Sequence, residues 1–91
     1  MTELREIQAL LDRMVDLLNL AAQPDWAGAL ERHREAIGTA PDITKARILA
    51  MYGGMGSLND VVLYKNGQPL SRENNEFDEL RIRLHELCRA T

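Results

Sequence analysis

A run of glycine divides the chain near its middle, where Gly53, Gly54 and Gly56 fill three of four positions. Glycine in a helix interior is less stable than alanine by about 1 kcal/mol, so a helix does not pass comfortably through this run. The residues before it show the apolar spacing of helices, whereas residues 61–64 after it are β-branched and aromatic. The run therefore separates a helical first half from a second half that contains extended chain.

The first half is predicted to contain three helices. Apolar residues recur every three or four positions over residues 2–22, and Pro24 is expected to end this helix. A second helix is expected to begin with Asp25 as its cap and to reach about Ile37. A third is expected over residues 42–52, with apolar side chains on nearly every face. A helix of that kind is predicted to be buried between the others.

The second half is predicted to contain a β-hairpin and a last helix. Asn66-Gly67 joins two short extended segments, residues 61–64 and 68–70, and both turn residues tolerate the positive φ of a two-residue hairpin. The hairpin alone would be marginal, so it is expected to lean on the helices. The last helix is expected over residues 76–89. The predicted fold class is therefore mainly α, a four-helix domain with a small β-hairpin inserted before the last helix, in a single domain over residues 1–91.

Composition argues against several classes of protein. No apolar run approaches the ~20 residues that span a bilayer, and the N-terminus lacks the pattern of a secretory signal. Cys88 is the only cysteine, so no internal disulfide forms. We therefore expect a cytoplasmic protein without a membrane partner.

The charge pattern favours a protein partner over nucleic acid. The net charge is −3, and the basic residues are interleaved with acids instead of forming a patch. The densest basic group, Arg81, Arg83 and Arg89, shares its segment with several glutamates and aspartates. A mildly acidic surface suits a basic protein, because complementary potential speeds encounter.

No motif in the chain predicts catalysis, a metal or a cofactor. The glycine run lacks the lysine and hydroxyl residue of a phosphate-binding loop, and Asn59 stands where a dinucleotide fingerprint needs a third glycine. His85 and Cys88 have a spacing that can bind metal, but only His33 remains as a further nitrogen or sulfur ligand. Ser57 has no motif that would make it a nucleophile. We therefore predict no catalytic residue, no metal site and no cofactor, and do not expect an enzyme.

The polar residues beside the glycine run are the strongest candidates for binding, because binding residues often lie on loops. The purely structural alternative is a tight helix-to-strand connection, with the acids near residue 76 as a solvated capping face and Trp26 packed on the first helix. The predicted contact residues come from the loop, the hairpin and the start of the last helix. They are Gly54, Met55, Ser57, Asn59, Asp60, Tyr64, Lys65, Asn66, Glu73 and Glu76.

The segment Met51-Tyr52-Gly53-Gly54-Met55-Gly56-Ser57-Leu58-Asn59-Asp60-Val61-Val62-Leu63 resembles a motif of small uncharacterised bacterial domains. Those domains have a helical first half, a Gly-Gly-Met-Gly-Ser-x-Asn-Asp loop, a short hairpin and a closing helix. Some are similar to immunity proteins that are paired with polymorphic or type VI secreted toxins. The resemblance covers residues 51–77 and implies a protein partner, with no catalytic residues.

Two functions follow as hypotheses. The first is a small cytoplasmic protein-binding inhibitor, an immunity protein that neutralises a cognate bacterial toxin by covering its active site. The alternative is a self-associating structural or regulatory helical module without catalytic activity, because the first helix has more apolar surface than one face needs. In isolation the chain would then be a monomer under the first hypothesis and a homodimer under the second.

Overall fold

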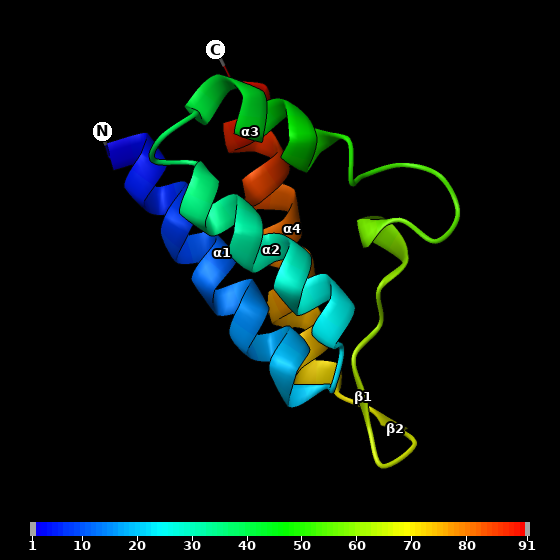
Figure 1. Ribbon diagram of the computed structural model, residues 1–91. Coiled ribbons are helices and arrows are strands. Elements are labelled where there is room, and N and C mark those ends of the chain that lie inside the picture. The colour runs from blue at the N-terminus through cyan, green and yellow to red at the C-terminus, as the bar shows by residue number, and fades with distance from the viewer. Residues whose placement is uncertain (1, 91) are drawn as a thin grey trace.

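The first and last helices, α1 (Thr2–Leu20) and α4 (Ser71–Arg89), run antiparallel and form the long axis of the protein (Figure 1). The computed structural model describes residues 2–90. The apolar stripe of α1 is fully buried at Ile7, Leu11, Met14 and Leu18, each with 0% of its surface exposed. Because α1 contacts both α2 (Pro24–Ala36) and α4, its stripe supplies the centre of the core.

Two ion pairs connect the exposed edges of α1 and α4. Arg13 donates two hydrogen bonds to the carboxylate of Glu76, at 2.6 and 2.9 Å. Nearer the other end, Arg83 donates to Glu6 at 2.8 and 3.2 Å. These two-pronged contacts bridge the antiparallel helices at two points, although exposed pairs of this kind add little stability.

The turn between α1 and α2 differs from the prediction at the helix start. Pro24 is the first residue of α2 and Gln23 precedes it as the cap, so Asp25 lies in the first turn and is not the cap. Proline is tolerated at this position because its missing N–H would have no helical partner. Ala22 reverses the chain with φ of 55°, and Gln23 N–H donates to Leu18 O at 2.9 Å.

The third helix, α3 (Pro41–Leu49), is shorter than predicted and is not buried between the others. It lies across one end of the α1–α4 pair (Figure 1), where it contacts α4. Only Thr44 and Ile48 are buried, whereas Ile43 is 50% exposed. The expectation of burial was wrong because a helix that covers the end of a bundle needs only one inward face.

The hairpin forms at the predicted turn but has shorter strands. β1 (Tyr64–Lys65) pairs antiparallel with β2 (Gln68–Pro69), with Tyr64 opposite Pro69. The turn residues Asn66 and Gly67 have φ of 54° and 76°, as a two-residue hairpin turn requires. All strand residues are exposed, so the hairpin does not lean on the helices through its strands, and the chain is attached only at its base.

The last helix begins at Ser71, five residues earlier than the predicted start at Glu76. Residues 71–75 are polar because they begin the helix at the surface, with Ser71, Arg72 and Asn75 exposed, and this polarity resembles that of a loop in the sequence. Glu73 in that turn suits the positive end of the helix dipole. The predicted fold class is nonetheless confirmed: the described chain has four α-helices and one small antiparallel hairpin before the last of them.

One hydrophobic cluster unites the four helices with Leu58 and Leu63 from the second half of the chain. Within residues 2–90, no helix combines the length and the apolar character that a membrane crossing requires.

The positive φ at Ala22 predicts that Ala22→Gly stabilises the protein. Alanine in the left-handed region is strained by about 1 kcal/mol, and glycine is not. We expect the free energy of unfolding in urea to rise by about that amount. The matched control is Ala9→Gly on the exposed face of α1, which should lower stability by about 1 kcal/mol. Equal losses in both variants would contradict the assigned turn.

Candidate functional site

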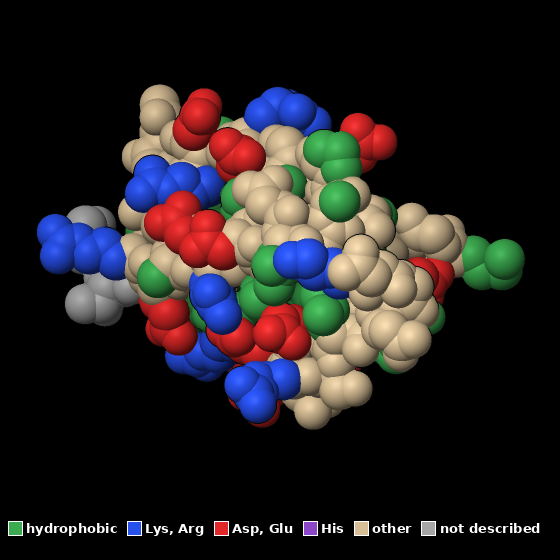
Figure 2. Space-filling model, turned by 90° about the horizontal axis from the view of Figure 1, so that it is seen from below, with side chains coloured by type: hydrophobic (Ala, Val, Ile, Leu, Met, Phe, Trp, Pro, Cys, Tyr) green, Lys and Arg blue, Asp and Glu red, His purple; other side chains and the backbone are tan. Residues whose placement is uncertain are grey.

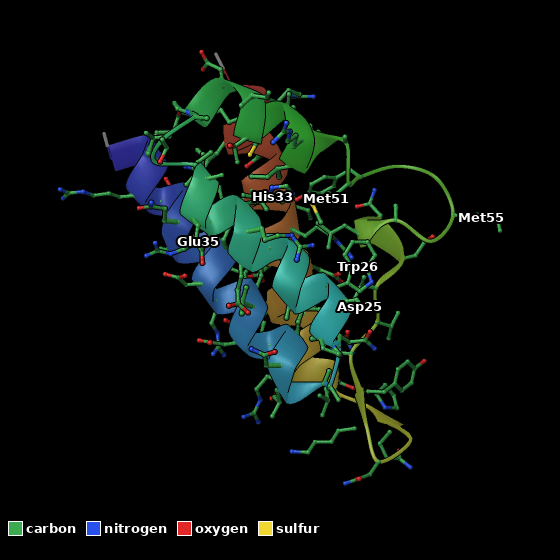
Figure 3. The ribbon with its side chains drawn as sticks, viewed as in Figure 1. Asp25, Trp26, His33, Glu35, Met51 and Met55 are labelled. Atoms are coloured by element: carbon green, nitrogen blue, oxygen red, sulfur yellow. The ribbon has the colours of Figure 1, made fainter. Side chains whose placement is uncertain are left out.

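A loop from Met51 to Leu58 projects from the helical body (Figures 1 and 3). Its glycines at 53, 54 and 56 have φ of +87°, +82° and +74°, and a Cβ on any of them would meet nothing within 4 Å. Glycine is therefore required here by backbone conformation and not by close packing. Met55 stands at the tip with 99% of its surface exposed.

Hydrogen bonds within the chain close the base of this loop. Leu58 is fully buried, and its N–H donates to Met51 O at 2.9 Å. Asn59 N–H donates to the Ser57 hydroxyl at 3.3 Å, which caps the 3₁₀ turn η1 (Leu58–Asp60). Gly56 N–H donates to one carboxylate oxygen of Asp60 at 2.7 Å. Ser57 and Asp60 thus shape the loop, in addition to being exposed or half-buried candidates for contact.

Arg81 of α4 holds the far side of the turn. Its guanidinium donates to the carbonyls of Leu58 and Asn59, at 3.0 and 3.1 Å, and also pairs with Asp78. Only 14% of the Arg81 side chain is exposed. In return, the Tyr52 hydroxyl donates to Arg81 O at 2.7 Å. Both ends of the loop are therefore attached to Arg81 on α4. Arg81 was not among the predicted contact residues.

Asn74 of α4 attaches the base of the hairpin in a similar way. Leu63 N–H donates to Asn74 Oδ1 at 2.8 Å, and Asn74 Nδ2 donates to Leu63 O at 3.0 Å. Leu70 N–H donates to the same carbonyl at 2.9 Å. The Asn74 side chain thus bonds the Leu63 backbone in the way that a neighbouring strand would. These bonds keep the extended residues 61–63 beside the helix. Asn74 was also not predicted.

A shallow depression of about 450 Å³ lies between the loop base, β1 and the start of α2. Trp26 combines two roles there, because it packs partly against the core and also lines the depression. It lies on the side of α2 that faces the loop (Figure 3). The residues that line the depression come from three separate elements: Gln23, Trp26, Gly56, Ser57, Asp60, Val61, Val62 and Tyr64.

The predicted contact residues separate into two groups on the structure. Gly54, Met55, Ser57, Asn59, Asp60 and Tyr64 belong to one continuous stretch beside the depression, and the exposed residues Lys65 and Asn66 extend it to the hairpin turn. We call residues 53–66 together with Trp26 the loop–hairpin face. Glu73 and Glu76 lie elsewhere, at the seam between α4 and α1.

The two glutamates are associated with Arg13 of α1. The Arg13 hydrogen bonds hold the pKa of Glu76 below its usual value, and the same hydrogen bonds, with a smaller contribution from the charge of Glu73, raise the pKa of Arg13. At the end of the molecule seen in Figure 2, acidic and basic side chains alternate, with several apolar side chains between them. Glu73 and Glu76 therefore belong to a mixed seam between helices and not to the loop–hairpin face.

The groups that were weighed as metal ligands come from two helices, His33 from α2 and His85 and Cys88 from α4. Burial raises the pKa of the Cys88 thiol to about 11, so this thiol stays protonated at neutral pH. The His85 ring stands edge-on to Tyr52, with centroids 4.8 Å apart. His33 has its pKa lowered by burial and by nearby Arg32 and Arg47. In the described part of the chain, no His, Cys, Asp and Glu side chains gather in the threes that a metal ion needs.

We predict that Arg81→Lys loosens the loop without unfolding the helices. In arginine one nitrogen donates to both carbonyls and a second nitrogen pairs with Asp78, whereas lysine carries all its donors on one nitrogen and cannot reproduce this fork. Hydrogen exchange of the Leu58 amide should accelerate by about tenfold or more, while amides of α1 stay unchanged. Arg83→Lys, two residues further along α4, is the control and should leave Leu58 protected. Unchanged exchange in Arg81→Lys would refute the anchoring role.

A family model described as a domain of unknown function, DUF6966, matches residues 20–71. The match covers more than half of the 91 residues, and the chain belongs to this family. It extends from the end of α1 to the start of α4, and so includes the whole loop–hairpin face. No curated protein and no solved structure matches the chain.

Proposed function

We propose that this member of the DUF6966 family is a protein-binding inhibitor, and that its loop–hairpin face covers a functional surface of its partner. The observation that carries the proposal is that three of the six large apolar side chains exposed in the described residues belong to that face. Met55, Val62 and Tyr64 are 99%, 46% and 51% exposed and lie within ten residues of one another in the sequence. Exposed apolar groups that gather beside polar ones are typical of protein interaction sites.

The anchoring of the face supports the same proposal. Arg81 and Asn74 hold the loop base and the hairpin base against α4. A surface that is already ordered loses less conformational entropy when a partner binds. The tip residue Met55 is 99% exposed, and methionine adapts its shape to the surface that it meets. Trp26 and Tyr64 add two residue types that frequently dominate binding energy.

The specific form that we propose is a cytoplasmic immunity protein for a bacterial toxin. The support is the Gly53–Asp60 segment, which resembles the corresponding loop of domains similar to immunity proteins. The net charge of −3 also suits a basic partner, because the potential of each protein would then steer the other. In this form the loop enters or covers the toxin's active site and excludes its substrate.

The alternative remains self-association through the helices. It was motivated by surplus apolar residues on α1, but the structure places Val15 and Leu17 in the core, with 8% and 1% of their surfaces exposed. The exposed apolar residue that most favours the alternative is Ile82 of α4, at 60% exposure. An isolated isoleucine is normal on a protein surface, so we favour the loop–hairpin face.

The test is to capture partners of the tagged chain from its native cells, and to compare a loop variant with a control. We expect one protein to bind in a 1:1 complex that re-forms from purified components. The double variant Met55→Ser, Tyr64→Ser should weaken that complex by about tenfold or more. The control Ile43→Ser removes a similarly exposed apolar side chain from α3 and should bind normally.

Two results would contradict the proposal. Equal affinity of the loop variant and the unmodified chain would show that the partner uses another surface. Recovery of only the chain itself, as a dimer that the loop variant still forms and Ile82→Ser abolishes, would favour the self-associating module.

A further inference from the structure

We propose that the depression between Trp26 and Tyr64 receives a positively charged side chain, lysine or arginine, from the protein partner. That this side chain belongs to a protein partner rests on the proposed function. The preference for a cation rests on the lining of the depression alone, which comes from the α2 start, the loop base and β1.

The charge of the lining favours a cation. Among residues 2–90, Asp60 is the only charged residue that lines the depression. One of its carboxylate oxygens accepts the Gly56 N–H at 2.7 Å, and within residues 2–90 no lysine or arginine pairs with this carboxylate. A positively charged group in the depression would therefore meet a negative charge that the chain itself does not neutralise.

A neighbouring depression provides a comparison. It lies on the other side of Val61 and Val62 and is also lined by an aspartate, Asp78. There the carboxylate is paired with Arg81, whose guanidinium is already committed to the loop carbonyls. Of these two depressions, only the one beside Trp26 and Tyr64 presents an acid without an internal cationic partner.

The remaining lining is partly aromatic and aliphatic. Trp26 and Tyr64 line the depression from two different elements, together with Val61 and Val62. Aromatic faces attract guanidinium and ammonium groups, with tryptophan the most effective. The long hydrocarbon stem of lysine or arginine packs on apolar side chains while its charged end reaches a polar group.

The start of α2 is the feature that opposes a cation, because helix N-termini carry a partial positive charge. Two residues reduce this effect. Pro24 has no N–H to present, and the carboxylate of Asp25 lies in the first turn. The nearest helix end therefore does not reverse the preference that Asp60 and the aromatic rings create.

The experiment titrates the ¹⁵N-labelled full chain with N-acetyl-arginine amide, and in parallel with its neutral isostere N-acetyl-citrulline amide, at constant ionic strength. We expect saturable shifts of the Trp26 indole N–H and of the Gly56 and Tyr64 amides with the arginine probe. The citrulline probe should bind at least about threefold more weakly, because it lacks the charge that Asp60 and the rings attract.

Two variants locate the charge that matters. Asp60→Asn should weaken the arginine probe about three- to fivefold, and its amide oxygen can still accept the Gly56 N–H, so the loop keeps its shape. Asp25→Asn removes the same charge from the neighbourhood but not from the lining, and should change the affinity little.

The proposal is wrong if both probes shift the same resonances equally, if Asp60→Asn binds the arginine probe as well as the unmodified chain does, or if the shifts lie outside the depression. Because the probe is not the partner, the two proposals fail separately. Saturable arginine binding without any captured partner would contradict the proposed function alone, and a captured partner without arginine binding would contradict this inference alone.

Discussion

Arg81 joins the last helix to the loop over residues 51–58. The glycines of this loop leave its backbone with little local preference for one conformation. The Arg81 guanidinium reaches two backbone carbonyls, at Leu58 and Asn59, and an acid on its own helix. Leu58 is completely buried, so its carbonyl has no access to bulk water that could replace this donor. The place where the turn at residues 58–60 is held sets the position of Met55. It also sets the shape of the depression beside Trp26 and the path of the chain towards the hairpin.

The rest of the protein acts as a scaffold for that turn. α1 and α4 supply a mainly aliphatic core and are bridged by pairs such as Arg13–Glu76. α4 also carries the side chains that hold the loop and hairpin. This arrangement is typical of binding proteins, in which rigid helices position loops that make the contacts. The exposed apolar residues of the loop–hairpin face stand on a segment whose bases are held to α4 by Arg81 and Asn74, which favours binding over simple chain connection.

The sequence predicted those features that depend on local backbone preference. The Asn66-Gly67 turn follows from positive φ, and the helical content follows from periodic apolar residues. The start of α4 was missed because a polar helical turn and a polar loop have the same composition. Arg81 and Asn74 were missed because each bonds backbone atoms 11 to 23 residues away, and such contacts leave no local pattern. The separation of Glu76 from the loop likewise depends on tertiary packing.

Site-specific photo-cross-linking in the native cells tests most directly whether this protein meets its partner through the loop–hairpin face. A photoreactive amino acid would replace Met55 at the loop tip, and in a second strain Ala9 on the exposed face of α1. We predict that the chain labelled at position 55 forms one cross-linked product with a different protein, and that the chain labelled at position 9 does not. A product formed only from position 9, or the same product from both, would contradict the account.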